Sequence, residues 1–148
     1  MANVAVGQEA PDFTLRDDSL QQFTLSSLRG KPVVLVFYPA DFSPLCTTEM
    51  CAYRDDWSLF EDKGAEVIGI SRDSVWSHKA FKAKEGLKNR LLADMKGQVA
   101  QLYGCWNEAS ATAERLTVVI NREGKVTYVE HNSPAQIRDQ KQALAAIS

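Results

Sequence analysis

An apolar run that leads into a cysteine constrains this chain more than any other stretch. The 148-residue sequence reads VVLVFYPADFSPLCTTEMC from Val33 to Cys51. A short apolar run bounded by turn residues predicts a buried strand. Ser43-Pro44 then predicts a helix start, with a capping hydroxyl and a proline in the first turn. Cys46 is therefore expected in the first turn of a helix that follows a central strand.

The position expected for Cys46 favours thiol chemistry. In the first turn of a helix the backbone N–H groups lack partners, and the helix dipole favours negative charge. A thiol placed there loses its proton more easily, and the thiolate is the nucleophile. The alternative for a lone cysteine is a structural role in the core, which is a common one.

The helical period separates the two cysteines of this stretch. At about 100° per residue, Cys46 lies at the edge of an apolar stripe and Cys51 falls on the polar side. Residues five apart on an ideal helix have Cα atoms roughly 8–9 Å apart, whereas a disulfide needs less than about 7 Å. If these cysteines bond, the first turns of the helix must unwind. The stripe consists of Met50, Tyr53, Trp57 and Phe60.

This segment resembles the active-site motif of the peroxiredoxins, whose pattern is Pro, three residues, Thr or Ser, two residues, Cys. The motif stands here as Pro39, Ser43 and Cys46. The Thr-x-Glu and second cysteine that follow, up to Cys51, are similar to the bacterioferritin-comigratory, or Q-type, branch. The resemblance runs from about residue 7 to residue 128.

The order of expected elements points to an α/β sandwich. It matches the thioredoxin-like fold that the resemblance implies: a central mixed sheet flanked by helices, with an N-terminal hairpin, in a single domain over residues 1–148. The helix that carries Cys46 is expected to continue to Gly64. Beyond the hairpin in residues 1–30 and the central strand, strands are expected at 65–70, 91–93, 116–120 and 125–130, and helices at 75–84, 97–103 and 134–146.

Several finer expectations follow from the same patterns. The helix over 75–84 is expected to use Trp76 and Phe81 as its apolar contacts, and the last helix to begin after Ser133 with Ile137 and Leu144 facing inward. Residues 107–112 are expected to form a surface loop. His78 and His131 have no triad pattern around them and are expected to be surface or capping residues.

Composition and charge exclude several classes of protein. A net charge of −2 gives no electrostatic basis for binding nucleic acid or an anionic membrane. The N-terminus has no basic start and no long apolar middle, so no signal peptide is expected and a cytoplasmic location follows. Three cysteines, with no CxxC and no Cys/His pair at zinc spacing, predict neither a secreted disulfide scaffold nor a structural metal site.

The resemblance assigns activating roles to residues around Cys46. Ser43 would hold the peroxide and the thiolate through its hydroxyl, and Pro39 would shield the thiolate from water. Arg115 would reach the cysteine, stabilise its charge and polarise the peroxide. Plain alternatives remain for each: a helix cap for Ser43, a strand terminator for Pro39, and a surface ion pair with the neighbouring Glu114 for Arg115.

Three further residues enter the predicted site. Glu49 is expected either in the hydrogen-bond network around the site or in a simple capping role. Cys51 is the predicted resolving thiol, which would attack the Cys46 sulfenic acid after local unwinding; its alternative is a passive surface cysteine. Cys105 is the alternative resolving residue, although its apolar neighbours favour a core position.

The resemblance implies a peroxidase that needs no metal, haem or flavin. Its substrates would be hydrogen peroxide and organic hydroperoxides, and a thioredoxin or glutaredoxin-like reductant would restore the dithiol of a monomer or homodimer. Two alternatives use the same fold: a thiol–disulfide exchange protein, against which CxxxxC argues, and a redox sensor that changes shape on oxidation.

Overall fold

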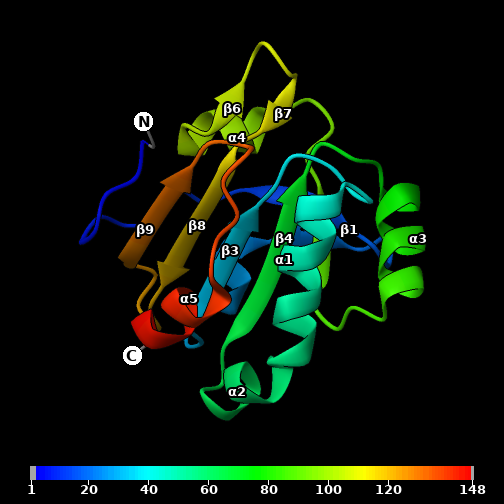
Figure 1. Cartoon of the computed structure of the whole chain (residues 1–148). Helices are drawn as coiled ribbons and strands as arrows, with labels where there is room; N and C mark the ends of the chain where they lie inside the picture. The colour runs from blue at the N-terminus through cyan, green and yellow to red at the C-terminus, as the bar shows by residue number, and fades with distance from the viewer. Residues whose placement is uncertain (1–2, 148) are drawn as a thin grey trace.

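A seven-stranded mixed sheet organises the computed structural model (Figure 1), which describes residues 3–147. Met1, Ala2 and Ser148 of the expected range lie outside the described residues. The strand order is β2-β1-β5-β4-β3-β8-β9. In chain order the elements are β1 (Thr14–Asp17), β2 (Gln22–Thr24), η1 (Leu25–Leu28), β3 (Val33–Phe37), α1 (Pro44–Asp55), α2 (Trp57–Asp62), β4 (Glu66–Ser71), α3 (Val75–Glu85), β5 (Arg90–Ala93), α4 (Gln98–Tyr103), β6 (Trp106–Asn107), β7 (Thr112–Ala113), β8 (Arg115–Ile120), β9 (Val126–Asn132) and α5 (Gln140–Ala146).

The central position of β3 follows from its sequence. All five of its residues are buried, as expected of a strand covered on both faces. It pairs in parallel with β4, Val33 opposite Glu66, and antiparallel with β8, Val34 opposite Val119. Because α1 begins just beyond the carboxyl end of β3, the start of that helix lies at the edge where α/β sheets bind ligands.

Alternate residues of β3 face two different cores. Val34 and Val36 belong to one buried cluster with residues of α1, α2, α3 and α5, and Leu35 and Phe37 belong to another with residues of α4 and the N-terminal hairpin. Figure 1 shows α1 and α5 in front of the sheet, and α4 with the β6–β7 hairpin at its upper end. The thioredoxin-like fold, with a mixed sheet between helical layers, is confirmed.

The expected hairpin near the N-terminus is also confirmed. β1 and β2 pair antiparallel, with Leu15 opposite Phe23, and a 3-10 turn follows at Leu25–Leu28. The hairpin extends the main sheet, because β1 pairs antiparallel with β5, with Arg16 opposite Ala93.

Two predicted helices have different bounds. The helix expected to run from Pro44 to Gly64 breaks at Asp56 into α1 and α2, where φ is −98° and ψ is 15°. The last helix begins at Gln140 with Asp139 as its cap, not after Ser133. Residues 133–139 are instead an extended segment and turns that cross toward α1, because Arg138 of this segment binds a buried carboxylate there.

Three side-chain orientations were predicted wrongly. Trp76 is 64% exposed and Ile137 is 45% exposed, so neither is a core contact. His78, expected at the surface, is fully buried, and it lies with Phe81 on the buried side of α3. The expected loop over residues 107–112 is the short hairpin of β6 and β7, with Asn107 paired to Thr112.

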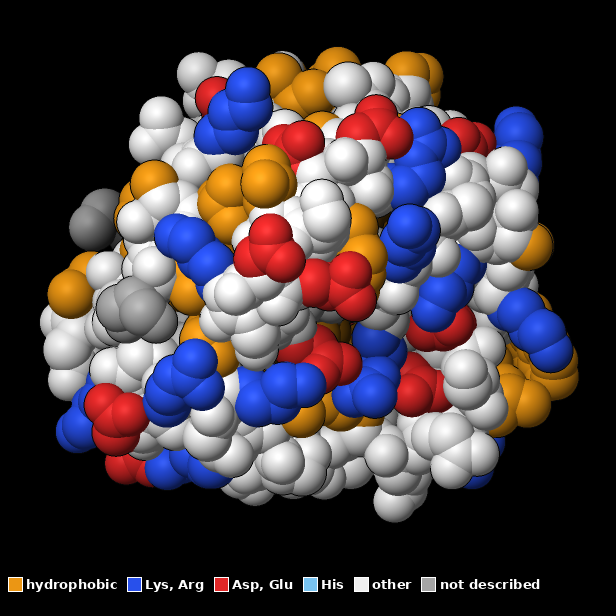
Figure 2. Space-filling view, turned by 90° about the horizontal axis from the view of Figure 1, so that it is seen from below, with side chains coloured by type: hydrophobic (Ala, Val, Ile, Leu, Met, Phe, Trp, Pro, Cys, Tyr) orange, Lys and Arg blue, Asp and Glu red, His pale blue; other side chains and the backbone are white. Residues whose placement is uncertain are grey.

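The charged side chains are mixed rather than segregated on the face seen from below. Figure 2 shows Lys and Arg alternating with Asp and Glu across it, in keeping with the net charge of −2. None of the helices formed by residues 3–147 has the length and apolar character that crossing a bilayer requires.

The turn after α4 gives a test of the packing. Gly104 has φ 78°, and a Cβ placed there would lie 2.5 Å from the backbone N of Asn3. We expect Gly104→Ala to lower the free energy of unfolding by roughly 1–3 kcal/mol, measured by urea denaturation. Gly86→Ala is the matched control, because Gly86 has φ 66° but open space around it. Equal losses for the two variants would contradict the clash with Asn3.

Candidate active site

The turn between β3 and α1 is shaped by Ser43. Its backbone is extended, with φ −66° and ψ 146°, and its Oγ accepts a hydrogen bond from the N–H of Cys46 at 3.4 Å. Pro44 follows in the first turn, where the missing N–H costs nothing. The predicted helix cap is therefore confirmed. Since Oγ acts as an acceptor here, its O–H remains able to donate to a group at the helix start.

Cys46 is fully buried and contacts Ser43 and Arg115, two residues that line a hollow in the surface. The hollow has a volume of ≈ 260 Å³ and its wall is mostly proline and leucine carbon, with Ser43 and Arg115 as the polar members. A small molecule that enters therefore meets a hydroxyl and a guanidinium next to the sulfur. The lining residues are Pro39, Ser43, Pro44, Leu45, Arg115 and Pro134.

Arg115 reaches this site from the first residue of β8. Its Nη1 donates to Cys46 Sγ at 3.4 Å and to Glu49 Oε1 at 2.6 Å, and its Nε donates to the carbonyl of Pro134 at 2.8 Å. The side chain is 2% exposed. A guanidinium is always charged, so a fixed cation lies against the sulfur.

The alternative ion pair between Arg115 and Glu114 is not formed. Glu114 instead binds His131 through Oε1 at 2.8 Å and accepts a hydrogen bond from Asn107 Nδ2 at 2.9 Å. The two side chains point in different directions: that of Glu114, just before β8, meets residues of β6 and β9, whereas that of Arg115 meets α1.

Glu49 is the centre of a buried ionic network. Arg138 donates to it from three atoms: the backbone N and Nε to Oε2, both at 2.8 Å, and Nη2 to Oε1 at 2.9 Å. Arg138 Nη1 also donates to Thr117 Oγ1 at 3.2 Å. The carboxylate therefore joins α1 to both β8 and the segment before α5. Of the two roles expected for Glu49, its contacts match the hydrogen-bond network and not the helix cap.

The electrostatics of Glu49 reflect these partners. Burial alone would raise the pKa of Glu49, but the hydrogen bonds and charge of Arg138, together with the charge of Arg115, hold that pKa below its ordinary value. Glu49 is thus kept as a carboxylate. Its charge offsets two buried cations while leaving Nη1 of Arg115 shared with the sulfur.

Arg138 is the site residue that the sequence reading missed. The helix expected over 134–146 includes Arg138, and an arginine on such a helix is expected to be exposed. The one signal available was the turn-forming Ser133-Pro134 followed five residues later by Asp139, which caps α5. Placing the helix start at Asp139 would have left Arg138 in a loop beside the site.

A second polar network, which includes residues of α3, holds the turn between β3 and α1. Asp41 accepts hydrogen bonds from Tyr38 OH at 2.6 Å and Ser77 Oγ at 2.9 Å, and its backbone N donates to Asp73 Oδ2 at 2.8 Å. His78 Nδ1 lies 2.7 Å from Asp41 Oδ2. These contacts fix Asp41, which lies between Pro39 and Ser43 in the chain. His78 is buried rather than at the surface because the Asp41 carboxylate gives its ring a polar partner there.

The residue between these two anchors is strained. Phe42 has φ 68°, in the left-handed region that bulky residues rarely adopt. Asp41 is held on one side and the Ser43 cap on the other, and the Phe42 ring packs on Phe81 with centroids 5.1 Å apart. Backbone strain held by surrounding contacts is typical of functional sites.

Cys51 lies one and a half turns after Cys46 on the same unbroken helix. It is partly buried, and its Sγ donates to Glu85 Oε1 at the end of α3 at 3.5 Å. Burial, followed by the hydrogen bond to Glu85, raises the pKa of the Cys51 thiol. The structure therefore does not bring Cys51 next to Cys46.

Cys105 lies on the opposite face of the sheet. It is 1% exposed and packs in the cluster with Leu35, whereas Cys46 packs in the cluster with Val34. Burial, with a further contribution from the carboxylates of Asp94 and Glu114, raises the pKa of the Cys105 thiol to about 12. The core position that its neighbours indicated is confirmed, and the sheet separates it from Cys46.

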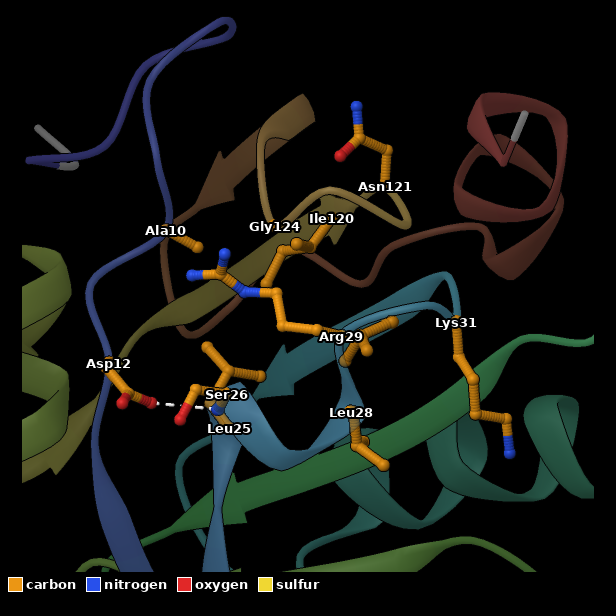
Figure 3. A pocket seen from close by; sticks show the side chains of 11 residues that line it. Ala10, Asp12, Leu25, Ser26, Leu28, Arg29, Lys31, Ile120, Asn121 and Gly124 are labelled. Atoms are coloured by element: carbon orange, nitrogen blue, oxygen red, sulfur yellow. Dashed lines mark hydrogen bonds between the residues drawn. The ribbon is translucent and has the colours of Figure 1, made fainter.

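A second pocket lies at the other end of β3, lined in part by Val33, Arg29 and Asp12. Figure 3 shows the hydrogen bond from Ser26 N to Asp12 Oδ1, at 2.9 Å, on one side of it. Arg29 is paired with Glu9 at 2.8 Å. This pocket contains no thiol or imidazole. Within residues 3–147, no group of three or more His, Cys, Asp or Glu side chains is arranged to hold a metal ion.

Comparison with known proteins gives a consistent family. Residues 6–129 match the AhpC/TSA family. A peroxiredoxin Q of rice, Oryza sativa subsp. japonica, described as chloroplastic, is 44% identical over 130 residues; the match covers 87% of this chain and 60% of the rice protein. The chain thus spans about three-fifths of the length of that plant relative.

Shorter relatives are matched over most of their length. A bcp peroxiredoxin of Coxiella burnetii is 41% identical over 133 residues, which are 86% of this chain and 88% of that protein. The crystal structure of peroxidoxin BcpB from Mycobacterium tuberculosis superposes with a TM-score of 0.89 at 33% identity, covering 97% of this chain and 96% of that one.

The Glu49 network predicts a specific dependence of stability on pH. Because the pKa of folded Glu49 lies below its ordinary value of 4.5, its contribution to stability is complete above that value. It is lost as the pH falls through the folded pKa. We expect Glu49→Gln to be less stable than the wild type at pH 7, and this difference to shrink in acid, measured by denaturation at a series of pH values. Glu61→Gln, at an exposed position on α2, is the control; a pH-independent gap for Glu49→Gln would contradict the network's charge.

Proposed function

The chain belongs to the peroxiredoxins of the AhpC/TSA family, in the peroxiredoxin Q and bcp branch, and from that membership we propose that it reduces hydroperoxides with the thiol of Cys46. The observation that carries the proposal is the 3.4 Å contact between Arg115 Nη1 and Cys46 Sγ in a buried first helical turn. The thiolate is the attacking species, and a fixed guanidinium against the sulfur can stabilise the charge that moves from it to the departing oxygen during attack.

In the first step Cys46 attacks one oxygen of the peroxide. The new S–O bond forms as the O–O bond breaks, which gives a sulfenic acid and leaves water or an alcohol once the leaving oxygen takes up a proton. Arg115 stabilises charge on the sulfur and on the departing oxygen. Ser43 can donate its O–H to the bound peroxide, because its Oγ accepts the Cys46 N–H, and Pro39 excludes water from the wall of the hollow.

The substrates are hydrogen peroxide and organic hydroperoxides. Ser43 and Arg115 supply polar contacts for the O–O group, whereas Pro44, Leu45 and Pro134 offer apolar surface to an alkyl substituent. Leu45 is 39% exposed, so the apolar wall continues outward from the hollow toward solvent.

Cys51 is the resolving thiol in this proposal. It lies on the same helix as Cys46 and on the same side of the sheet, whereas Cys105 is buried on the other side. Unwinding of the first turns of α1 brings Cys51 to the sulfenic acid, and a disulfide forms with release of water. A thioredoxin or glutaredoxin-like dithiol then reduces that disulfide and completes the cycle.

The proposed compartment and oligomeric state are based on the same redox cycle. A cycle that ends in reduction by a dithiol requires a reducing compartment, in keeping with the expected cytoplasmic location. One thioredoxin-like domain over residues 1–148 is proposed to suffice, as a monomer or a homodimer, since Cys46, Cys51 and Arg115 all come from a single chain.

The first test removes the attacking sulfur. Reduced protein is mixed with one equivalent of hydrogen peroxide and peroxide loss is followed in time. We expect fast loss in the wild type and loss no faster than that of a free thiol in Cys46→Ser, because Cys46 is the thiol to which a guanidinium donates a hydrogen bond. Cys105→Ala is the control and should react like the wild type. A Cys46→Ser variant that consumed peroxide at the wild-type rate would refute the proposal, and slow loss in the wild type would favour a sensor.

The second test identifies the resolving thiol. With thioredoxin and its reductase as the only source of reducing thiols, we expect Cys51→Ser to stop after about one turnover per chain, with Cys46 left as a sulfenic acid, because the variant has lost the thiol that forms the disulfide on which thioredoxin acts. Peptide mass mapping of the oxidised wild type should show a Cys46–Cys51 linkage. A Cys46–Cys105 linkage, or continued turnover of Cys51→Ser, would overturn the assignment of Cys51.

A further inference from the structure

Two residues of α1 are attached to a single residue at the end of α3. Cys51 Sγ donates to Glu85 Oε1 at 3.5 Å, and Arg54 Nη1 donates to the backbone carbonyl of Glu85 at 2.6 Å. Glu85 is the last residue of α3, and the left-handed Gly86 that follows it ends the helix. Its carbonyl is one of those that a helix end leaves without an intrahelical partner, so Arg54 satisfies it.

This attachment opposes the movement that resolution requires. Cys46 and Cys51 lie on one continuous helix, where Cα atoms five residues apart are separated by roughly 8–9 Å. A disulfide needs less than about 7 Å. Cys51 therefore has to leave its helical position, and its contact with Glu85 has to break, before the two sulfurs meet.

The same contact makes the Cys51 thiol harder to ionise. The thiol donates its hydrogen to a carboxylate, so a thiolate at this position would face a negative charge. Burial first, and then Glu85, raise the pKa of Cys51; Asp55 acts in the same direction, and Arg54 opposes them. Since the thiolate is the nucleophile, release from Glu85 both frees Cys51 to move and makes it easier to ionise.

On the basis of the function proposed above, we propose that Glu85 is a positioning residue that holds the Cys51 thiol against α3 and so sets the rate at which Cys51 resolves the Cys46 sulfenic acid. In that step the Cys51 sulfur attacks the Cys46 sulfur, an S–S bond forms and the S–O bond breaks. The leaving hydroxide and the Cys51 proton combine as water. Cys51 is oxidised and Cys46 is reduced to the disulfide level.

The hold on Cys51 has a consequence for overoxidation. While Glu85 retains Cys51, the Cys46 sulfenic acid persists and can meet a second peroxide, which converts it to the sulfinic acid. Weakening the contact should therefore shorten the life of the sulfenic acid and reduce sulfinic acid formation at high peroxide.

The test compares Glu85→Gln with a matched control. Glutamine keeps a side-chain acceptor near Cys51 but removes the negative charge. Glu108→Gln makes the same change at an exposed position in the β6–β7 hairpin. In a Cys46→Ser background, alkylation of Cys51 by iodoacetamide is followed across pH by peptide mass. We expect Glu85→Gln to be alkylated roughly 3–10-fold faster at neutral pH, with its midpoint moved to lower pH.

A second measurement keeps Cys46 intact. After one equivalent of peroxide, the Cys46–Cys51 disulfide should form faster in Glu85→Gln than in Glu108→Gln, while the initial loss of peroxide stays unchanged. Alkylation and disulfide formation at the control rate would overturn the role of Glu85. Peroxide loss at a free-thiol rate in the wild type would instead overturn the proposed function, and the alkylation result would still decide whether Glu85 holds Cys51.

Discussion

The buried carboxylate of Glu49 is the contact on which the rest of the site depends. It lies on the first half of α1 and binds Arg115 of β8 and Arg138 of the segment before α5. Two guanidinium groups would not be stable in this interior without a shared anion, and a lone carboxylate would take up a proton there. The three charges therefore fix α1 against the sheet with Arg115 beside Cys46, so the geometry at the sulfur is set by an ion network rather than by the cysteine.

That network also opposes the second half of the proposed cycle. Glu49 lies between Cys46 and Cys51 on the helix, so unwinding those turns draws the carboxylate away from both arginines. Removing one partner of a buried ion pair typically costs about 3–5 kcal/mol. The hold of Glu85 on Cys51 acts in the same direction from the other end of the segment. In the proposed cycle these contacts hold the site in place for attack on peroxide, and they have to break before resolution.

Local signals explain what could be predicted from the sequence. The apolar run of β3, the Ser43-Pro44 start and the position of Cys46 depend on neighbours within a few residues, and each was placed correctly. Arg115 was assigned mainly through the resemblance to the peroxiredoxins, at the start of an apolar strand where a buried charge needs a partner. Arg138 and His78 were missed because their partners, Glu49 and Asp41, are distant in sequence. A buried charge can be recognised only when the group that compensates it is known.

The sheet itself decides which thiols can meet. Adjacent residues of a strand point to opposite faces, so the cores on either side of β3 are separate compartments, and Cys46 and Cys105 are in different ones. Bonding them would require passage around or through the most buried strands of the molecule, whereas Cys46 and Cys51 need only the first turns of one surface helix to open. Local unwinding disrupts far fewer contacts than opening of the sheet. The topology thus favours Cys51 independently of thiol reactivity, even though the reduced helix holds the two sulfurs apart.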